Sequence, residues 1–72
     1  MREKIIELIE RNLNLEPGTI TEDTRIEDVE GWDSLAHVLI IGDLDADLGI
    51  SIPLDQAIEI ETVAELFEKA GV

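Results

Sequence analysis

Three stretches of this 72-residue chain carry apolar side chains at helical spacing, and this pattern restricts the possible folds more than any other feature. The stretches run from Met1 to about Leu13, from Ser34 to Leu48 and from Thr62 to Ala70. In each of them apolar residues recur three or four positions apart, so they share one face of an α-helix. These residues are Ile5, Leu8, Ile9 and Leu13, then Leu35, Val38, Leu39, Ile41, Leu44 and Leu48, and finally Val63, Leu66, Phe67 and Ala70. A chain of this length forms one small domain, residues 1–72, in which these faces cover one another. The sequence therefore predicts an all-α bundle.

Signals between these stretches set the boundaries of the helices. The Glu-Pro-Gly sequence at residues 16–18 ends the first helix, while Gly49 and Gly71 end the second and the last. The last helix begins at Thr62, since residues 62–65 have the form of a capping box. On the first helix, charged residues are predicted to occupy the face opposite to the apolar one: Glu3, Lys4, Glu7, Glu10 and Arg11.

Two less regular segments separate the main helices. A short helix is predicted to start near Leu54 or Asp55 and to end by Glu59. Residues 14–33 form a long connection with a single helical turn around Ile26–Val29, and such connections need anchors in the core. The predicted anchors are Leu15, Ile20, Ile26 and Val29. The prediction is a small four-helix bundle with three main helices, one short helix, a long first loop and no strand.

An excess of acidic residues limits the partners of such a bundle. Eighteen Asp and Glu against five Lys and Arg give a formal net charge of −13. This charge repels nucleic acid and anionic membrane surfaces, so we expect neither as a partner. It attracts basic patches on other proteins through electrostatic steering. The hydrophobic share of 44% is too high for a disordered chain, and we expect a folded monomer with protein partners.

Cysteine and histidine usage excludes several chemistries. The chain has no cysteine, which excludes disulfides and thiol nucleophiles, and a single histidine cannot form a zinc site by itself. The acidic run Asp43–Gly49 does not fit a calcium loop, because leucines stand where that loop needs its glycine and its bidentate glutamate. The first residues lack the apolar stretch of a signal peptide, and no apolar run is long enough to span a membrane. We expect no metal site and a cytoplasmic location.

The stretch Gly31–Leu35, where the long loop turns into the second helix, contains the candidate site. Asp33 and Ser34 are both strong N-cap residues, so one explanation is that Ser34 only caps the helix. The other is that Ser34 carries an anion, because a helix N-terminus offers free N–H groups and the positive end of the helix dipole. His37 lies one turn from Ser34, which leaves a small Ser34/His37 hydrolase as a remote alternative. No residue that could orient His37 is evident, and we expect it to face solvent.

The residues around Ser34 form a specific combination. Asp33-Ser34-Leu35 stands at the start of the second helix. The flanking segments are Thr24 to Val29 upstream and Asp47 to Ile50 at the acidic helix end, followed by Ile52-Pro53, Ala57, Ile60 and Thr62-Val63. In this combination the chain resembles the acyl carrier protein family over nearly its whole length.

The resemblance implies a carrier rather than an enzyme. A dedicated phosphopantetheinyl transferase would move 4′-phosphopantetheine from coenzyme A to Ser34, which Asp33 and Leu35 would help to present. The thiol of that group would hold acyl intermediates as thioesters and shuttle them between enzymes of fatty acid, polyketide or related biosynthesis. By position, the resemblance also implies partner-docking residues and acyl-cavity residues. The docking residues are Leu35, Val38, Asp45 and Glu59, and the cavity residues are Leu44, Ile52, Ala57 and Ile60.

Three features depart from the common fatty-acid carriers. The segment from Val29 to Asp33 has one residue more, Leu39 stands where a docking acid is usual, and Gly42 replaces a larger apolar residue. Gly42 costs the helix about 1 kcal/mol relative to Ala, and it either permits close packing or opens a space. Gly31–Leu35 is similar to stand-alone carriers of specialised pathways, such as polyketide, peptide or glycan-modifying systems. An acidic carrier-like interaction module that is never modified is the alternative.

Overall fold

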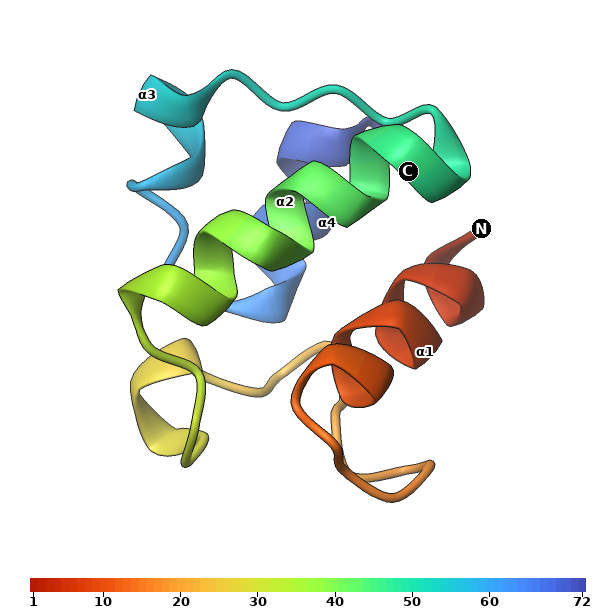
Figure 1. Ribbon diagram of the computed structural model, residues 1–72, viewed down its shortest axis with the longest axis vertical. Coiled ribbons are helices and arrows are strands. Elements are labelled where there is room, and N and C mark those ends of the chain that lie inside the picture. The colour runs from red at the N-terminus through yellow and green to blue at the C-terminus, as the bar shows by residue number, and fades with distance from the viewer.

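The computed structural model describes all residues from 1 to 72 and contains four α-helices and no β-strand. The helices are α1 (Arg2–Asn12), α2 (Ser34–Leu48), α3 (Leu54–Ala57) and α4 (Val63–Ala70). Helix α1 packs along α2, and the chain after α2 runs back to α3, which contacts α4 (Figure 1). None of the helices is both long and apolar enough to cross a membrane. The predicted all-α four-helix bundle is confirmed.

All four helices and the long loop contribute to one hydrophobic core. Its buried residues are Ile5, Leu8, Ile9, Ile20, Trp32, Ile40, Ile41, Leu44, Ile52, Ala57, Ile60, Val63, Leu66 and Phe67. Burying a large apolar side chain is worth roughly 1.5–3 kcal/mol relative to leaving it exposed. Helices as short as these are marginal in isolation, so the shared core stabilises them.

Side-chain caps and glycines define the ends of the helices. Asp33 is the N-cap of α2, and its Oδ1 accepts a 2.8 Å hydrogen bond from the Ala36 amide. Gly49 ends α2 with a φ of 69°, in the left-handed region, as predicted. The predicted capping box of α4 is present, since Thr62 accepts from the Glu65 amide at 3.1 Å and Glu65 accepts from the Thr62 amide at 3.0 Å. Helix α3 begins at Leu54 and ends at Ala57, within the predicted limit of Glu59.

The long connection between α1 and α2 is held by its apolar side chains. The four predicted anchors lie in or against the core: Leu15, Ile20, Ile26 and Val29. A single 3₁₀ turn spans Ile26–Asp28, where one helical turn is predicted. Three backbone hydrogen bonds of 3.0 Å join the loop to the start of α4. The Ile26 amide donates to the Glu61 carbonyl, and the Val63 and Ala64 amides donate to the carbonyls of Thr24 and Glu22. The loop is therefore fixed against α4 before it reaches α2.

Glu10 corrects the prediction for the first helix. The helical pattern places it on the charged face, but only 5% of its surface is exposed. Its Oε2 accepts a 3.0 Å hydrogen bond from the Ile20 amide, in the loop that follows α1. The prediction is wrong because the partner of Glu10 lies outside the helix and leaves no mark on the helical pattern. Glu10 instead holds the loop against α1.

The consecutive apolar residues in the middle of α2 point to two sides. Ile40 and Ile41 are buried, whereas Val38 and Leu39 are exposed. Gly42 is also exposed, and a methyl group added there would meet no atom within 4 Å. The sequence left two roles for Gly42, close packing or an open space, and close packing is excluded. The glycine faces open space at the surface and does not widen an internal cavity.

Candidate functional site

Ser34 is the first residue of α2 and lies exposed at the end of the long loop. The side chain of Asp33 caps the helix, and the Ser34 hydroxyl makes no hydrogen bond. The amides of Ser34 and Leu35 have no backbone acceptor. A free hydroxyl therefore stands beside two free N–H groups at the positive end of the α2 dipole.

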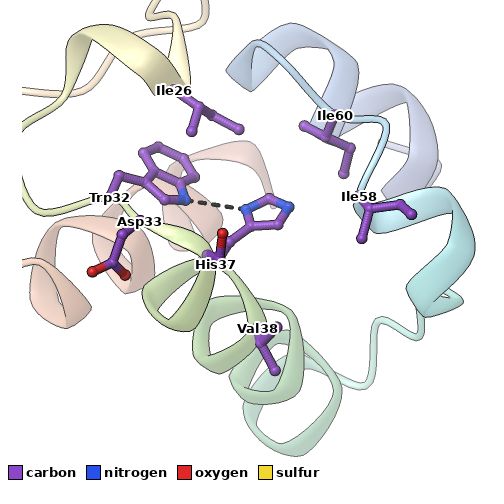
Figure 2. A pocket seen from close by; sticks show the side chains of 8 residues that line it. Ile26, Trp32, Asp33, His37, Val38, Ile58 and Ile60 are labelled. Atoms are coloured by element: carbon purple, nitrogen blue, oxygen red, sulfur yellow. Dashed lines mark hydrogen bonds between the residues drawn. The ribbon is translucent and has the colours of Figure 1, made fainter.

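A pocket of about 410 Å³ opens beside Ser34 (Figure 2). Its lining comes from the long loop, from the first turns of α2 and from the chain after α3: Ile26, Trp32, Asp33, Ser34, His37, Val38, Ile58 and Ile60. Five of these eight residues are hydrophobic. The pocket thus offers an apolar surface next to any group that Ser34 carries.

Two hydrogen bonds of His37 cross this region from the long loop to α3. The Trp32 Nε1–H donates to His37 Nδ1 at 3.1 Å (Figure 2). His37 Nε2 lies 2.8 Å from the carbonyl oxygen of Ala57. An indole N–H can only donate, so Nδ1 is the acceptor and the ring proton is assigned to Nε2, which donates to Ala57. Trp32, His37 and the Ala57 carbonyl therefore form one connected chain, which we call the imidazole bridge.

The imidazole bridge corrects the prediction that His37 faces solvent. The ring is half-buried and held on both sides. One partner precedes α2 and the other lies twenty residues further along the chain, so the spacing within α2 does not reveal them. Both ring nitrogens are occupied, and neither is free to accept a proton from Ser34. The geometry gives no support to a Ser34/His37 hydrolase.

The other predicted site residues fall into two groups. All four predicted docking residues are exposed: Leu35, Val38, Asp45 and Glu59. Of the predicted cavity residues, only Ile60 lines the pocket. The remaining three are buried in the core: Leu44, Ile52 and Ala57. The pocket beside Ser34 and the interior around these three residues are therefore separate places in the structure.

Four lining residues had no role in the predicted carrier site: Ile26, Trp32, His37 and Ile58. Among them His37 had a predicted role only in the hydrolase alternative. The sequence did contain a signal that Trp32 and His37 contact each other. A buried tryptophan needs an acceptor for its N–H, and His37 is the chain's only imidazole and lies five residues from Trp32. Ile26 was recognised only as a loop anchor, and the position of Ile58 depends on how α3 packs.

Comparison with known proteins first gives the class of the domain. Residues 3–69 match the family model described as "Phosphopantetheine attachment site". The chain is 36% identical over 69 residues to acyl carrier proteins of Rickettsia canadensis and Rickettsia rickettsii, covering 94% of this chain and 79% of each relative. A solved structure from Mycobacterium tuberculosis, described as "a putative acyl carrier protein", superposes with a TM-score of 0.86 at 30% identity, over 97% of this chain and 93% of the other. The chain belongs to the acyl carrier protein family.

Acyl carrier proteins are carriers, not enzymes, and their family implies a covalently attached 4′-phosphopantetheine in this chain as well. The start of α2 fits such a group. Free amides at a helix N-terminus suit a phosphodiester, and the apolar pocket lies beside the only hydroxyl there. No group of three or more His, Asp or Glu side chains is placed to hold a metal ion.

Proposed function

We propose that Ser34 is the residue to which 4′-phosphopantetheine is attached. The observation that carries this proposal is the division of roles between Asp33 and Ser34. Because Asp33 caps α2, Ser34 has no structural task, yet its hydroxyl is exposed at the helix start. The chain's other serine, Ser51, lies in the irregular segment between α2 and α3.

The residues around Ser34 then serve the carrier in three ways. The amides of Ser34 and Leu35 are available to the phosphodiester, Asp33 fixes the first turn, and the pocket receives cargo. The bound group supplies a thiol, the only one in this cysteine-free chain, which holds an acyl group as a thioester. The protein shuttles acyl intermediates in fatty acid, polyketide or related biosynthesis, and Gly31–Leu35 favours a stand-alone carrier of a specialised pathway.

The outer face of α2 and α3 is the proposed docking surface. Its exposed apolar residues are Leu35, Val38, Leu39, Leu54 and Ile58. Neither helix contains a Lys or Arg, and the exposed acids Asp45 and Glu59 lie on or next to them. The transferase and acyl-handling enzymes would therefore need an apolar centre flanked by basic groups.

Intact mass tests the attachment. The protein is incubated with coenzyme A and a broad-specificity phosphopantetheinyl transferase, alongside Ser34→Ala and the matched control Ser51→Ala. We expect one phosphopantetheine on the wild type and on Ser51→Ala, and none on Ser34→Ala. An equal gain in Ser34→Ala, or no gain in any sample, contradicts the proposal.

The second candidate function is an acidic interaction module that is never modified. The docking surface supports it, because its residues are exposed whether or not Ser34 is modified. The same experiment separates the two, since an unmodified module gives no mass gain in any of the three proteins.

A further inference from the structure

The start of α2 is held by few buried side chains. None of its first six residues, 34–39, is buried, and the first buried residue of the helix is Ile40. Among these six, Ala36 is the only partly buried hydrophobic residue that packs against the core. A helix end with so little burial frays unless other contacts hold it. The order of the turn that presents Ser34 therefore depends on hydrogen bonds.

One hydrogen bond ties the end of the long loop to this turn. The backbone bonds between the loop and α4 end at Ile26, and residues 27–32 make a single hydrogen bond to a residue outside the loop. In this bond Trp32 Nε1–H donates to His37 Nδ1 at 3.1 Å (Figure 2). Trp32 lies two residues before Ser34 and His37 three residues after it. This hydrogen bond, which we call the indole clamp, thus closes around Ser34.

The chain turns tightly just before the clamp. Gly31 has a φ of 89°, in the left-handed region that favours glycine, and the Trp32 amide donates to the Val29 carbonyl at 3.2 Å. The residue by which the segment from Val29 to Asp33 exceeds the common fatty-acid carriers lies in this turn. The turn places the indole in the core next to the start of α2.

The two hydrogen bonds of the His37 ring differ in importance. Trp32 is only 5% exposed, and its indole N–H has a single hydrogen, which His37 Nδ1 accepts. A buried donor left unpaired costs more than a typical hydrogen bond gains. The Ala57 carbonyl, in contrast, also accepts from the Ile60 amide at 3.2 Å and stays paired without His37. The bond to Ala57 orients the ring, and the indole clamp restrains the first turn of α2.

Attachment of the arm makes the direction of the Ser34 hydroxyl important. In the proposed transfer the Ser34 Oγ bonds to the phosphorus that carries the pantetheine, and the bond from that phosphorus to adenosine bisphosphate breaks. The serine proton passes to a base of the transferase. The attacking and leaving oxygens of such a transfer lie roughly in line. A hydroxyl that is already held in one direction meets this condition without further ordering.

We propose that Trp32 and His37 are positioning residues for this transfer, because their hydrogen bond holds the first turn of α2 and with it the direction of the Ser34 hydroxyl. This inference rests on the proposed attachment at Ser34. It deepens that proposal by assigning two further residues to the same reaction.

Steady-state kinetics separates positioning from stability, with coenzyme A, a broad-specificity phosphopantetheinyl transferase and the protein as the varied substrate. Trp32→Phe removes the indole donor and keeps an aromatic ring. We expect kcat to fall about tenfold, as for an unpaired buried donor. KM should change little, because Leu39, Leu54 and Ile58 of the docking surface lie outside the first turn. A variant that merely unfolds in part supplies less folded substrate, which raises the apparent KM and leaves kcat unchanged.

Two replacements of His37 form a matched pair. The side-chain oxygen of His37→Asn lies near the position of Nδ1, so it keeps an acceptor for the indole and loses the donor to Ala57. The amide of His37→Gln lies near the position of Nε2, so it keeps that donor and loses the acceptor. We expect His37→Asn to retain the wild-type kcat and His37→Gln to match Trp32→Phe. Glu10→Ala, which loses a buried hydrogen bond of α1, controls for lost stability and should keep the wild-type kcat.

The chain's single tryptophan gives a readout that does not involve the transferase. Hydrogen exchange of the Trp32 indole proton, followed by NMR, reports the clamp directly. We expect slow exchange in the wild type and in His37→Asn, and exchange at least about tenfold faster in His37→Gln. Equal exchange rates in all three proteins contradict the clamp.

The outcomes separate this inference from the attachment on which it rests. A wild-type kcat in both Trp32→Phe and His37→Gln, or an effect confined to KM, overturns positioning and leaves attachment standing. A His37→Asn protein with a protected indole and a reduced kcat overturns it as well. If Trp32→Phe does not fold, the two His37 variants decide. No modification of the wild type, or equal modification of Ser34→Ala, contradicts attachment, and the inference about positioning falls with it.

Discussion

Asp33 and Ser34 are adjacent in the sequence, and the side chain of either residue can act as a helix N-cap. In the structure Asp33 is the N-cap and accepts from the Ala36 amide, whereas the Ser34 hydroxyl stays unbonded. The proposed attachment residue is therefore free of any structural task. This separation predicts that stability and modification can be lost independently.

Asp33→Ala should lower the free energy of unfolding by about 1 kcal/mol, because it removes the cap of α2. Asp33→Asn keeps a capping oxygen and should retain most of the stability. Urea unfolding followed by circular dichroism measures both. Ser34→Ala is the matched control and should unfold like the wild type. A loss in Ser34→Ala as large as that in Asp33→Ala contradicts the assignment of the cap.

Glu10→Ala should destabilise the protein by roughly 1–3 kcal/mol, because the buried Ile20 amide loses its only acceptor. Glu10→Gln retains an acceptor and should lose less. Glu7→Ala, on the exposed face of the same helix, controls for the change in charge and should alter stability little. Equal effects at positions 7 and 10 in urea unfolding would show that burial of Glu10 is unimportant.

Among the elements, α2 combines three tasks along its length. Its first turn presents Ser34, its inner face contributes Ile40, Ile41 and Leu44 to the core, and its outer face exposes Val38 and Leu39. Gly42 lies on the exposed side in the middle of the helix. Nothing in the packing requires a glycine at this position.

Gly42→Ala should stabilise the protein by up to about 1 kcal/mol, because alanine restricts the unfolded chain and favours the helix. Thermal unfolding should show a higher midpoint. Gly49→Ala is the contrasting variant: its φ of 69° is strained for an L residue, so stability should fall. A lower midpoint for Gly42→Ala would mean that the glycine is needed for packing.

For the molecule as a whole, the large negative net charge is the dominant electrostatic feature. The net charge of −13 is spread over 72 residues, and the three ion pairs are all exposed, so they offset little of the repulsion. The pKa of Arg25 is raised, first by its hydrogen bond to Glu27, which keeps this guanidinium charged. Self-repulsion among the acids therefore opposes folding most strongly when little salt is present.

Added salt should therefore raise the melting temperature, because it screens repulsion between acidic side chains. Differential scanning calorimetry from low to near-physiological ionic strength measures the effect. A melting temperature that stays flat over this range contradicts a stability limited by charge.

The architecture could be predicted from the sequence because its signals are local. The helical spacing of apolar residues, the capping box at Thr62 and the glycine at Gly49 each act within a few residues. The position of Ser34 at the start of α2 was predictable for the same reason. What the sequence could not give were contacts between distant segments, and Glu10 and His37 are the two examples. Glu10 meets an amide ten residues away, and His37 meets a carbonyl twenty residues away.

The pocket shows most clearly what could not be predicted from the sequence of the whole molecule. Its walls come from the long loop, α2 and the segment after α3, so its shape depends on the assembled fold. Position within the family suggested a cavity around Leu44, Ile52 and Ala57, all of which are filled core positions here. Only Ile60 belongs both to that set and to the pocket.

The central claim is that Ser34 carries the phosphopantetheine arm in the living cell. Peptide-level mass spectrometry of the protein isolated from its own cells tests it most directly, because it locates the modified residue and reports the acyl group together. We predict phosphopantetheine on the peptide that contains Ser34, with an acyl group on part of the population. An unmodified Ser34 throughout, or the group on Ser51 or on a threonine, contradicts the claim.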